Sequence, residues 1–548
     1  MRRRINGAVR HERADGLVIA RFRHHTSRSC AEQHEKGQAP DPQLHDHCAI
    51  ANLALRQHDA LAKNGGNWAA VDSRELYRIA AEAGAVYRAE LAAELLQLGY
   101  RVHREGRYFE VSGVSKEARH TFSQRAREVE AATTRFVAKH GRRPTDEEAR
   151  NLVVLSRHPK AAEQVSAFAQ WHERAAEVGF SPTDLEQLRG RTPGALSLEM
   201  ATDQIVRELV APDSPHALTK NAAVFDERTL RIAVAEAAQG RARGADVGAL
   251  ITAVAASPEL VRLDVVHSTT QKMLDTERAA LLAARVKSLS AHGFSAKRSS
   301  VSAAISTARV ALSDEQQTAV RALTDDRALA LITAPAGAGK GEVLRAVTQA
   351  YRQDGRRVIA LAAAGDTAQR LGAEIGVDEA RTLDSFIVRA GGNDPPDIRG
   401  AVLVVDEAGL LETERWHRLL PATVGAKLIA AGDSAQLSPI EAGGLWPVLE
   451  QRLGAPTLSE NFRAREQWAR DAWTALREGQ SVDALRAFEE REQIVVVDDR
   501  QAARAAAVDR WDRERMGRGE GGWTASCCSP TAATPRSMPS TPPPSSDV

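Results

Sequence analysis

The chain lacks an excess of charge of either sign. Its 548 residues hold 73 Lys and Arg against 72 Asp and Glu, which gives a net charge of +1. The basic excess typical of nucleic-acid-binding proteins is therefore missing, and any such binding must come from local basic surface. The charge count neither supports nor excludes a nucleic-acid partner.

Cysteines are few, and long apolar runs are missing. Cys30, Cys48, Cys527 and Cys528 show no framework spacing, which indicates a reducing compartment without disulfides. The basic N-terminus is followed by no apolar segment of the secretory kind. No stretch approaches the roughly 18 apolar residues of a membrane span. We therefore expect a cytoplasmic protein with no membrane insertion.

What is present changes along the chain. Residues 1–125 mix strand-like runs with one long helical pattern at 73–99, which predicts an α/β unit or part of one. Residues 126–300 are strongly helical and predict a connector. Short apolar runs alternate with helical patterns between 301 and 465, which predicts a parallel sheet with helices on its faces. Ligands of such sheets bind at the carboxyl ends of the strands.

The last residues have another composition. Residues 523–548 are rich in Pro, Ser and Thr and have no apolar period, so we expect them to be disordered. The change near Trp523 is abrupt, which suggests a chain that was cut short or read in another frame.

The stretch "LITAPAGAGKGEVLRAV" resembles a phosphate-binding loop with two changes. The pattern requires Gly where Ala334 stands and a hydroxyl where Gly341 stands. A strand, a Gly-rich turn and a helix N-terminus in this order direct backbone N–H groups and the positive helix end at one anion. Gly337 and Gly339 would permit close approach, and Lys340 would reach the β and γ phosphates. The alternative is a tight turn between a strand and a helix.

The predicted nucleotide-binding residues are Gln316, Ala334, Pro335, Ala336, Gly337, Ala338, Gly339, Lys340 and Gly341. Ala334 is compatible with the loop if its φ is negative, and Pro335 already restricts it to extended angles. The loss of the hydroxyl at Gly341 matters more, because that group ordinarily ligates Mg²⁺. A water could replace it, with weaker metal binding.

Further polar residues follow other strands of the same predicted sheet. Asp406 and Glu407 end an apolar strand, where the Asp can hold Mg²⁺ and the Glu can polarise water; the alternative is a helix cap. Gln436 could sense the γ phosphate or belong to a polar turn. Arg463 could stabilise transferred charge or be an ordinary surface Arg. Gln316 could serve the site or form a capping box with Ser313.

Taken in order, these motifs resemble the first motor domain of superfamily 1 DNA helicases of the RecD-like type. The resemblance covers about 310–465 and implies a RecA-like ATPase fold with ATP and Mg²⁺ as cofactors. It implies that Gln316 contacts the adenine and that Gln436 couples the ATP state to DNA. The loops "AAAGDTAQRL" and "RTLDSF" would contact single-stranded DNA. Residues 466–522 would begin an incomplete second motor domain, so we expect slow hydrolysis and no unwinding.

Histidines cluster near the N-terminus. His45 and His47 alternate, so on a strand they face the same side, and His24 or His25 could supply a third ligand for a divalent metal. Imidazole suits Zn, Mn, Ni or Cu alike. The alternative is a pair of exposed histidines without metal.

The words "FRHHTSR", "DPQLHDHCAIAN" and "WAAVDSRELYRIAAEAGAVYRAEL" resemble conjugative relaxases of the MobF type, which carry an N-terminal relaxase joined to a RecD-like helicase. The resemblance implies that His24, His45 and His47 hold a divalent transition metal. It implies single-stranded DNA and a plasmid origin of transfer as partners, with other relaxosome and type IV secretion components.

The nucleophilic tyrosines of these relaxases precede the histidines. All tyrosines of this chain follow them, so we expect no covalent nicking by this polypeptide; they are Tyr77, Tyr87, Tyr100, Tyr108 and Tyr351. The sequence thus predicts a relaxase-helicase truncated at both ends, with a partial α/β relaxase domain, a helical region and a RecA-like ATPase domain. The rival interpretations are a non-catalytic DNA-binding or scaffold remnant, and a product without a stable fold.

Overall fold

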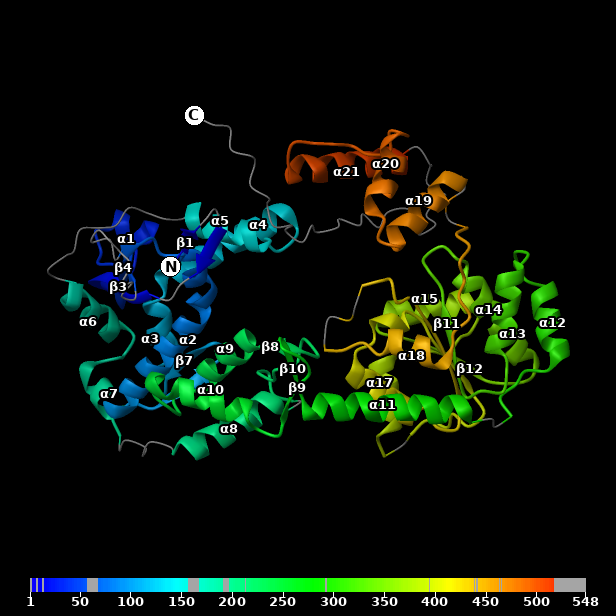
Figure 1. Ribbon diagram of the computed structural model, residues 1–548, viewed down its shortest axis with the longest axis horizontal. Helices are drawn as coiled ribbons and strands as arrows, with labels where there is room; N and C mark the ends of the chain where they lie inside the picture. The colour runs from blue at the N-terminus through cyan, green and yellow to red at the C-terminus, as the bar shows by residue number, and fades with distance from the viewer. Residues whose placement is uncertain are drawn as a thin grey trace. The chain divides into compact units, whose positions relative to one another are not determined.

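The computed structural model describes most of the chain, which divides into two compact units. The described residues are 2–5, 8–11, 14–56, 68–155, 167–190, 197–211, 213–290, 293–393, 395–437, 439, 442–462, 464 and 466–516. The first unit comprises Met1–Ala283, Glu412–Arg418 and Pro439–Leu445; the second comprises Ala284–Leu411, Leu419–Ser438 and Trp446–Val548. Figure 1 labels their helices and strands.

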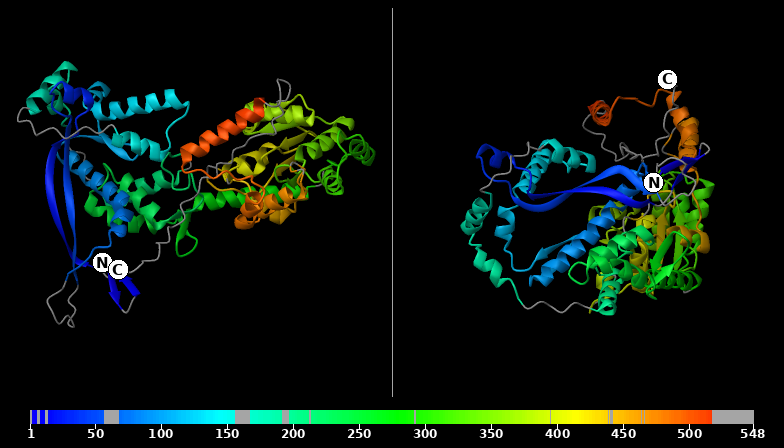
Figure 2. Two further views of the ribbon diagram at one scale, coloured as in Figure 1. Left: turned by 90° about the horizontal axis from the view of Figure 1, so that it is seen from above. Right: turned by 60° about the vertical axis from the view of Figure 1, so that its left-hand side comes forward.

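A long antiparallel hairpin dominates the start of the first unit. β3 (Ala14–Thr26) pairs with β4 (Pro42–Arg56), which also pairs with β5 (Trp68–Ala69). The register places His24 opposite His45. The strand-like runs predicted within residues 1–125 thus include β3 and β4, and Figure 2 shows the hairpin as two long blue ribbons.

Shorter elements complete the first unit. Two small hairpins join β1 (Arg2–Ile5) to β2 (Ala8–His11) and β6 (Val102–Glu105) to β7 (Tyr108–Val111). A three-stranded sheet has the order β8-β10-β9; its strands are β8 (Phe225–Asp226), β9 (Leu260–Arg262) and β10 (His267–Thr270). The stretch predicted as a helical connector thus also contains a small sheet.

The helices from α1 to α10 lie in the first unit, and α11 contributes residues to both units. They are α1 (Ala31–Glu35), α2 (Ser73–Gln97), α3 (Lys116–Thr121), α4 (Gln124–His140), α5 (Asp146–Leu155), α6 (Ala167–Glu177), α7 (Pro182–Gln187), α8 (Leu198–Val210), α9 (Glu227–Ala237), η1 (Gly244–Asp246), α10 (Val247–Ala255) and α11 (Gln271–Leu289). The helix predicted at 73–99 is confirmed as α2. Its Ala85 and Ala89 are fully buried against Ile205, Val234 and Leu250 of α8, α9 and α10.

The second unit is built on a five-stranded parallel sheet of order β11-β15-β14-β12-β13. The strands are β11 (Leu329–Thr333), β12 (Val358–Ala362), β13 (Ala380–Thr382), β14 (Val402–Val405) and β15 (Lys427–Gly432). Every residue of β11, β12, β14 and β15 is buried, as continuous apolar runs require when both faces of a parallel sheet are covered. The predicted mixed α/β fold with a parallel sheet is confirmed.

Helices cover both faces of this sheet. The core of one face joins alternate strand residues, such as Ile332, Val404 and Ile429, to α12 (Arg298–Ser306), α13 (Asp314–Leu323), α14 (Lys340–Gln353) and α15 (Gly365–Ile375). Strand residues pointing to the other face are equally buried, and α16 (Leu383–Ala390) and α18 (Trp446–Leu453) also contain buried apolar residues. The remaining elements are η2 (Ala408–Leu410) and α17 (Thr413–Ala422), of which α17 has residues in both units.

Three helices follow the sheet: α19 (Gln467–Arg477), α20 (Ser481–Glu489) and α21 (Arg500–Met516). The ring of Phe488 lies 5.6 Å from Trp468 and 5.5 Å from Trp473, so aromatic contacts join α19 to α20. This segment contains most of the predicted start of a second motor domain. The tail predicted to be disordered, 523–548, lies outside the described residues.

None of the helices in the described part of the chain is long and apolar enough to cross a membrane. Cys30 and Cys48 are free, as expected, whereas Cys527 and Cys528 lie outside the described residues. The cytoplasmic location stays a prediction.

Candidate nucleotide site and histidine cluster

The loop between β11 and α14 has the backbone of a phosphate-binding turn. Gly337 and Gly339 adopt positive φ angles of 92° and 77°. The positive φ favours glycine at position 339, and a Cβ there would lie 2.3 Å from Nε2 of Gln316, so a side chain would have to displace that amide. Ala334 is not among the described residues with positive φ other than glycine, and its N–H donates to the Gly432 carbonyl at 3.0 Å. The change from Gly to Ala334 is therefore compatible with the loop.

Gln316 forms the capping box that the sequence left open, and its role at the nucleotide stays a prediction. Its side chain and that of Ser313 form a capping box at the start of α13. The same amide donates from Nε2 to the Ala338 carbonyl at 3.1 Å, and the residue is buried. The residue that caps α13 therefore also holds the loop through its hydrogen bond to Ala338.

Lys340 meets two carboxylates from the next-but-one strand of the sheet. Its Nζ lies 2.5 Å from Asp406 Oδ1 and 3.0 Å from Glu407 Oε1. Burial alone would lower the pKa of Lys340, but the two carboxylates outweigh burial and raise the pKa above its ordinary value. The ammonium group is therefore charged and lies beside the two carboxylates predicted to act with it.

Glu407 adopts a strained backbone conformation. Its φ is 53°, a left-handed angle that among described residues other than glycine is shared only with Glu492. Such strain costs of the order of 1–3 kcal/mol and clusters at functional sites. The Glu407 side chain is 41% exposed, against 17% for Asp406, so Glu407 can reach solvent at the mouth of the site.

A second pair connects the sheet to the helices that follow it. Arg477 Nη1 and Nη2 donate to Asp433 Oδ2 and Oδ1, both at 2.6 Å. Burial would raise the pKa of Asp433, but the hydrogen bonds from Arg477 hold it below its usual value. Gln436 donates to Asp433 Oδ2 at 3.4 Å and is exposed. Arg463 lies outside the described residues, so its predicted role has no structural account.

Sequence reasoning missed Arg477. It ends an amphipathic helix, and no local motif distinguishes it from other basic residues near a helix C-terminus. Sequence reasoning also missed Glu450, which accepts a hydrogen bond from Thr333 at the end of β11. Only the tertiary fold brings these residues to the loop edge.

The residues present fit a magnesium nucleotide except at one position. The glycine turn, the N-terminus of α14 and Lys340 can hold phosphates, and Asp406 offers a carboxylate ligand for Mg²⁺. Gly341, the second residue of α14, contributes no hydroxyl.

The three predicted metal histidines lie together on the β3–β4 hairpin. The ring of His24 is 5.5 Å from that of His45 and 4.8 Å from that of His47. The Nε2 atoms of His45 and His47 are 3.3 Å apart, roughly the separation of two nitrogens bound to one tetrahedral ion. His25 instead contacts Phe168, with ring centroids 6.4 Å apart. His24 rather than His25 therefore lies in the cluster.

The cluster is not a complete metal site in this conformation. Across the described ranges, no group of three or more His, Cys, Asp or Glu side chains could hold a metal ion. His45 Nδ1 lies 2.9 Å from the Gln43 carbonyl, which fixes one side of the ring and leaves Nε2 toward His47. The metal role of the histidines stays a prediction.

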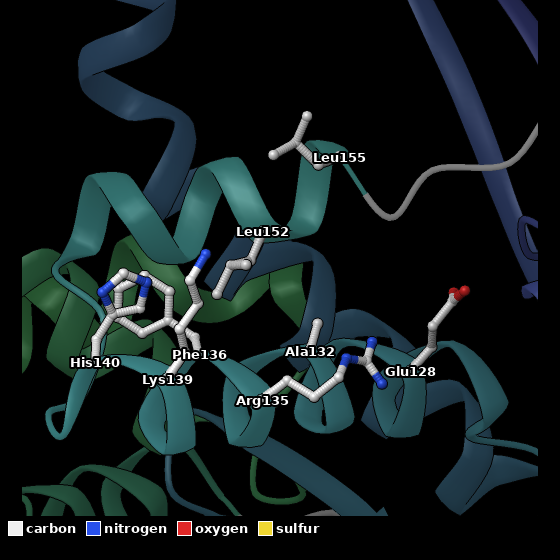
Figure 3. Close-up of a pocket in the computed structure, with 8 residues that line it drawn as sticks. All are labelled: Glu128, Ala132, Arg135, Phe136, Lys139, His140, Leu152 and Leu155. Carbon is white, nitrogen blue, oxygen red and sulfur yellow. The ribbon is translucent and has the colours of Figure 1, made fainter.

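A separate cavity of about 490 Å³ lies between α4 and α5 (Figure 3). Apolar side chains, basic side chains and one acidic side chain line it together: Glu128, Ala132, Arg135, Phe136, Lys139, His140, Leu152 and Leu155. None of the residues predicted from the sequence lines this cavity.

Comparison with known proteins matches both parts of the chain. Residues 311–499 match the model of the AAA domain, and residues 1–178 match that of the TrwC relaxase. The conjugal transfer protein TraA of Agrobacterium fabrum is 34% identical over 210 residues, which cover 37% of this chain and 18% of TraA. The ATP-dependent RecD2 DNA helicase of Deinococcus radiodurans is 32% identical over 160 residues, 28% of this chain and 21% of the helicase.

A solved structure of the conjugative relaxase TrwC in complex with oriT DNA is 32% identical, with a TM-score of 0.28, over 33% of this chain and 58% of that one. The chain spans about a fifth of the length of the two curated relatives. The resemblance that the motifs indicate is thus confirmed: the chain joins a segment similar to the TrwC relaxase to a segment similar to the AAA domain, an arrangement that supports a relaxase-helicase.

Proposed function

We propose that the second unit binds ATP and hydrolyses it in response to single-stranded DNA, as the motor part of a conjugative relaxase-helicase. The observation that carries this proposal is the meeting of Lys340 with Asp406 and Glu407 beside the glycine loop. A structural ion pair would not need a strained Glu407, nor a loop whose glycines leave room for an anion.

The residues have distinct proposed roles. Lys340 would exchange its present carboxylate partners for the β and γ phosphates. Asp406 would hold Mg²⁺, which in such sites neutralises charge on the phosphates. Glu407 would accept the proton of the attacking water, for which its partial exposure suits it.

Other residues would sense the nucleotide. Gln316 would contact the adenine while its amide fixes the loop through Ala338. Gln436 would respond to the γ phosphate. Its hydrogen bond to Asp433 would couple that response to Arg477, which binds the same carboxylate. Arg463 would stabilise the transferred charge.

Single-stranded DNA is the proposed partner of the loops that follow β12 and β13. Both loops lie at the carboxyl edge of the sheet, the same edge as the P-loop. Residues 363–366 are exposed there, and Thr382 caps α16 through the Ser385 N–H. By analogy with the conjugal transfer relatives, the natural DNA would be a plasmid origin of transfer, handled with relaxosome and type IV secretion components.

For the first unit we propose divalent metal binding at His24, His45 and His47, without strand nicking. Tyr87 interacts electrostatically with Arg23, which alternates with His24 and so lies on the opposite face of the hairpin. Every tyrosine of the chain follows the histidines in sequence, and this order is the basis of the proposal. A covalent tyrosyl-DNA adduct, sought by mass spectrometry after incubation with origin DNA, would contradict this.

The test of the motor proposal is steady-state ATP hydrolysis with and without single-stranded DNA. The native protein should show DNA-stimulated turnover, and Lys340→Ala should lose about 10²-fold or more. Lys116→Ala, an exposed lysine of the first unit, is the matched control and should keep native turnover. Equal turnover in the native protein and Lys340→Ala would reject the proposal.

One observation favours a second candidate, a nucleotide-binding scaffold without turnover. Gly341 removes the hydroxyl that ordinarily ligates the metal. Tight ATP binding with turnover at background in the native protein would support this alternative.

A further inference from the structure

A carboxylate from another helix lies where the missing hydroxyl would be. A Cβ built on Gly341 would lie 1.7 Å from Oε1 of Glu374 and 2.7 Å from its Cδ. Distances this short occur between bonded atoms and not between neighbours in contact. The Glu374 carboxylate therefore fills the volume that a Ser or Thr side chain would take at position 341.

The packing of α15 positions Glu374. Leu371 and Ile375, on either side of it in the helix, are buried in the core shared with α14. A Cβ on Gly372 would approach the Val377 carbonyl to 3.0 Å, so the helix end is held close to the chain that follows. The backbone of Glu374 is thus fixed by packing, while its side chain is exposed.

The carboxylate has no protein partner among the described residues. Neither a hydrogen bond nor an ion pair joins Glu374 to them, whereas Glu379, just before β13, is paired with Arg357. The nearby N-terminus of α14 favours negative charge. Glu374 therefore places carboxylate oxygens beside Gly341, the residue that follows Lys340 in the loop.

We propose that Glu374 supplies the oxygen ligand that the loop lacks at Gly341 and holds the divalent cation of bound ATP, directly or through one water. This inference rests on the proposed function of the nucleotide site. Carboxylate oxygens are preferred ligands of Mg²⁺. Since α15 begins at the loop proposed to contact DNA, Glu374 also connects the metal to that loop.

The experiment measures Mn²⁺ binding by electron paramagnetic resonance in the full chain with a non-hydrolysable ATP analogue. Glu374→Ala should weaken Mn²⁺ affinity about tenfold. The double variant Gly341→Ser with Glu374→Ala should regain much of it, because the restored hydroxyl then has space. Asp378→Asn, an exposed carboxylate just beyond α15, is the matched control and should bind Mn²⁺ as the native chain does.

Unchanged Mn²⁺ affinity in Glu374→Ala would overturn the inference, and so would tighter binding, which would mean that the carboxylate obstructs the metal. Binding of a fluorescent ATP analogue, measured without metal, distinguishes a failure of the proposed function from a failure of the role of Glu374. If the native chain binds no nucleotide, the proposed function fails and the role of Glu374 falls with it. If nucleotide binds and only the metal effect is absent, the role of Glu374 alone is wrong.

Discussion

Arg477 holds Asp433 through two parallel hydrogen bonds, each 2.6 Å long, and so ties the end of α19 to the end of β15. The Asp433 side chain is only 2% exposed, whereas that of Arg477 is 32% exposed. The same carboxylate accepts from Gln436, the predicted sensor of the γ phosphate. The pair is therefore the connection between the nucleotide edge of the sheet and the helices beyond it.

Removing this connection should destabilise the second unit. Arg477→Ala leaves the buried Asp433 carboxylate without its partner, and we expect a loss of about 2 kcal/mol in the free energy of unfolding. Arg477→Lys keeps the charge but not the two parallel bonds and should lie between the alanine variant and the native protein. Urea denaturation checks both variants, and native stability in Arg477→Ala would contradict the assigned role.

Alanine at position 339 should weaken ATP binding, whereas alanine at a glycine of similar φ outside the loop should not. Gly339→Ala meets both a φ of 77° and Gln316 Nε2 at 2.3 Å, so it should displace Gln316 and weaken ATP binding about tenfold or more. Gly376→Ala is the matched control, since it has a φ of 78° and open space around it. It should lose stability without losing nucleotide affinity. Equal ATP affinities, measured by fluorescent nucleotide titration, would show that the loop tolerates a side chain.

Stability should rise with pH above about 8. Lys427 is fully buried and hydrogen-bonded to the Asp325 and Arg327 carbonyls, and burial lowers its pKa to about 8. In the unfolded chain its pKa is about 10.4, so between these values the unfolded state binds more protons and stability increases with pH. Burial also lowers the pKa of Lys287 to about 8, with the same sign.

Lys427→Met removes this contribution and should flatten the rise between pH 8 and about 10, measured by denaturation at each pH. Lys287→Met should remove a separate part of the rise in stability with pH. An unchanged slope in Lys427→Met would mean that its ammonium group keeps an ordinary pKa in the folded protein.

Metal binding by the histidine cluster can be tested with a control residue, because His25 is adjacent to His24 in the chain. Alanine at His24, His45 or His47 should each weaken the binding of Zn²⁺ or Mn²⁺ to the full chain by about tenfold or more, because each removes one of three ligands. His25→Ala should bind metal as the native protein does, since His25 contacts Phe168 instead. Isothermal titration checks the set; identical effects at His24 and His25 would exclude a specific site.

The parallel sheet was predictable because its strands are nearly continuous apolar runs, each followed by polar residues. Val402–Val405 before Asp406 is the clearest case, and the positions of Lys340, Asp406 and Glu407 at one edge follow from sheet geometry. In the sheet, β15 lies between β11 and β14. The prediction does not depend on this order, because the carboxyl ends of all parallel strands lie at the same edge.

Contacts between segments distant in sequence were not predictable. Arg477 reaches Asp433, and Glu374 reaches Gly341, only through the packing of α19 and α15, which leaves no local pattern. The choice between His24 and His25 likewise depended on strand register, because adjacent residues of a strand face opposite sides. The small sheet of β8, β9 and β10 was missed because its strands are two to four residues long.

The most direct test of the catalytic constellation is Glu407→Gln, assayed for both ATP binding and DNA-stimulated hydrolysis. The amide keeps the size of the side chain but cannot accept the proton of the attacking water. We expect ATP affinity close to native and turnover reduced by about 10²-fold or more. Native turnover in Glu407→Gln would contradict the account, because the strained carboxylate beside Lys340 would then have no part in hydrolysis.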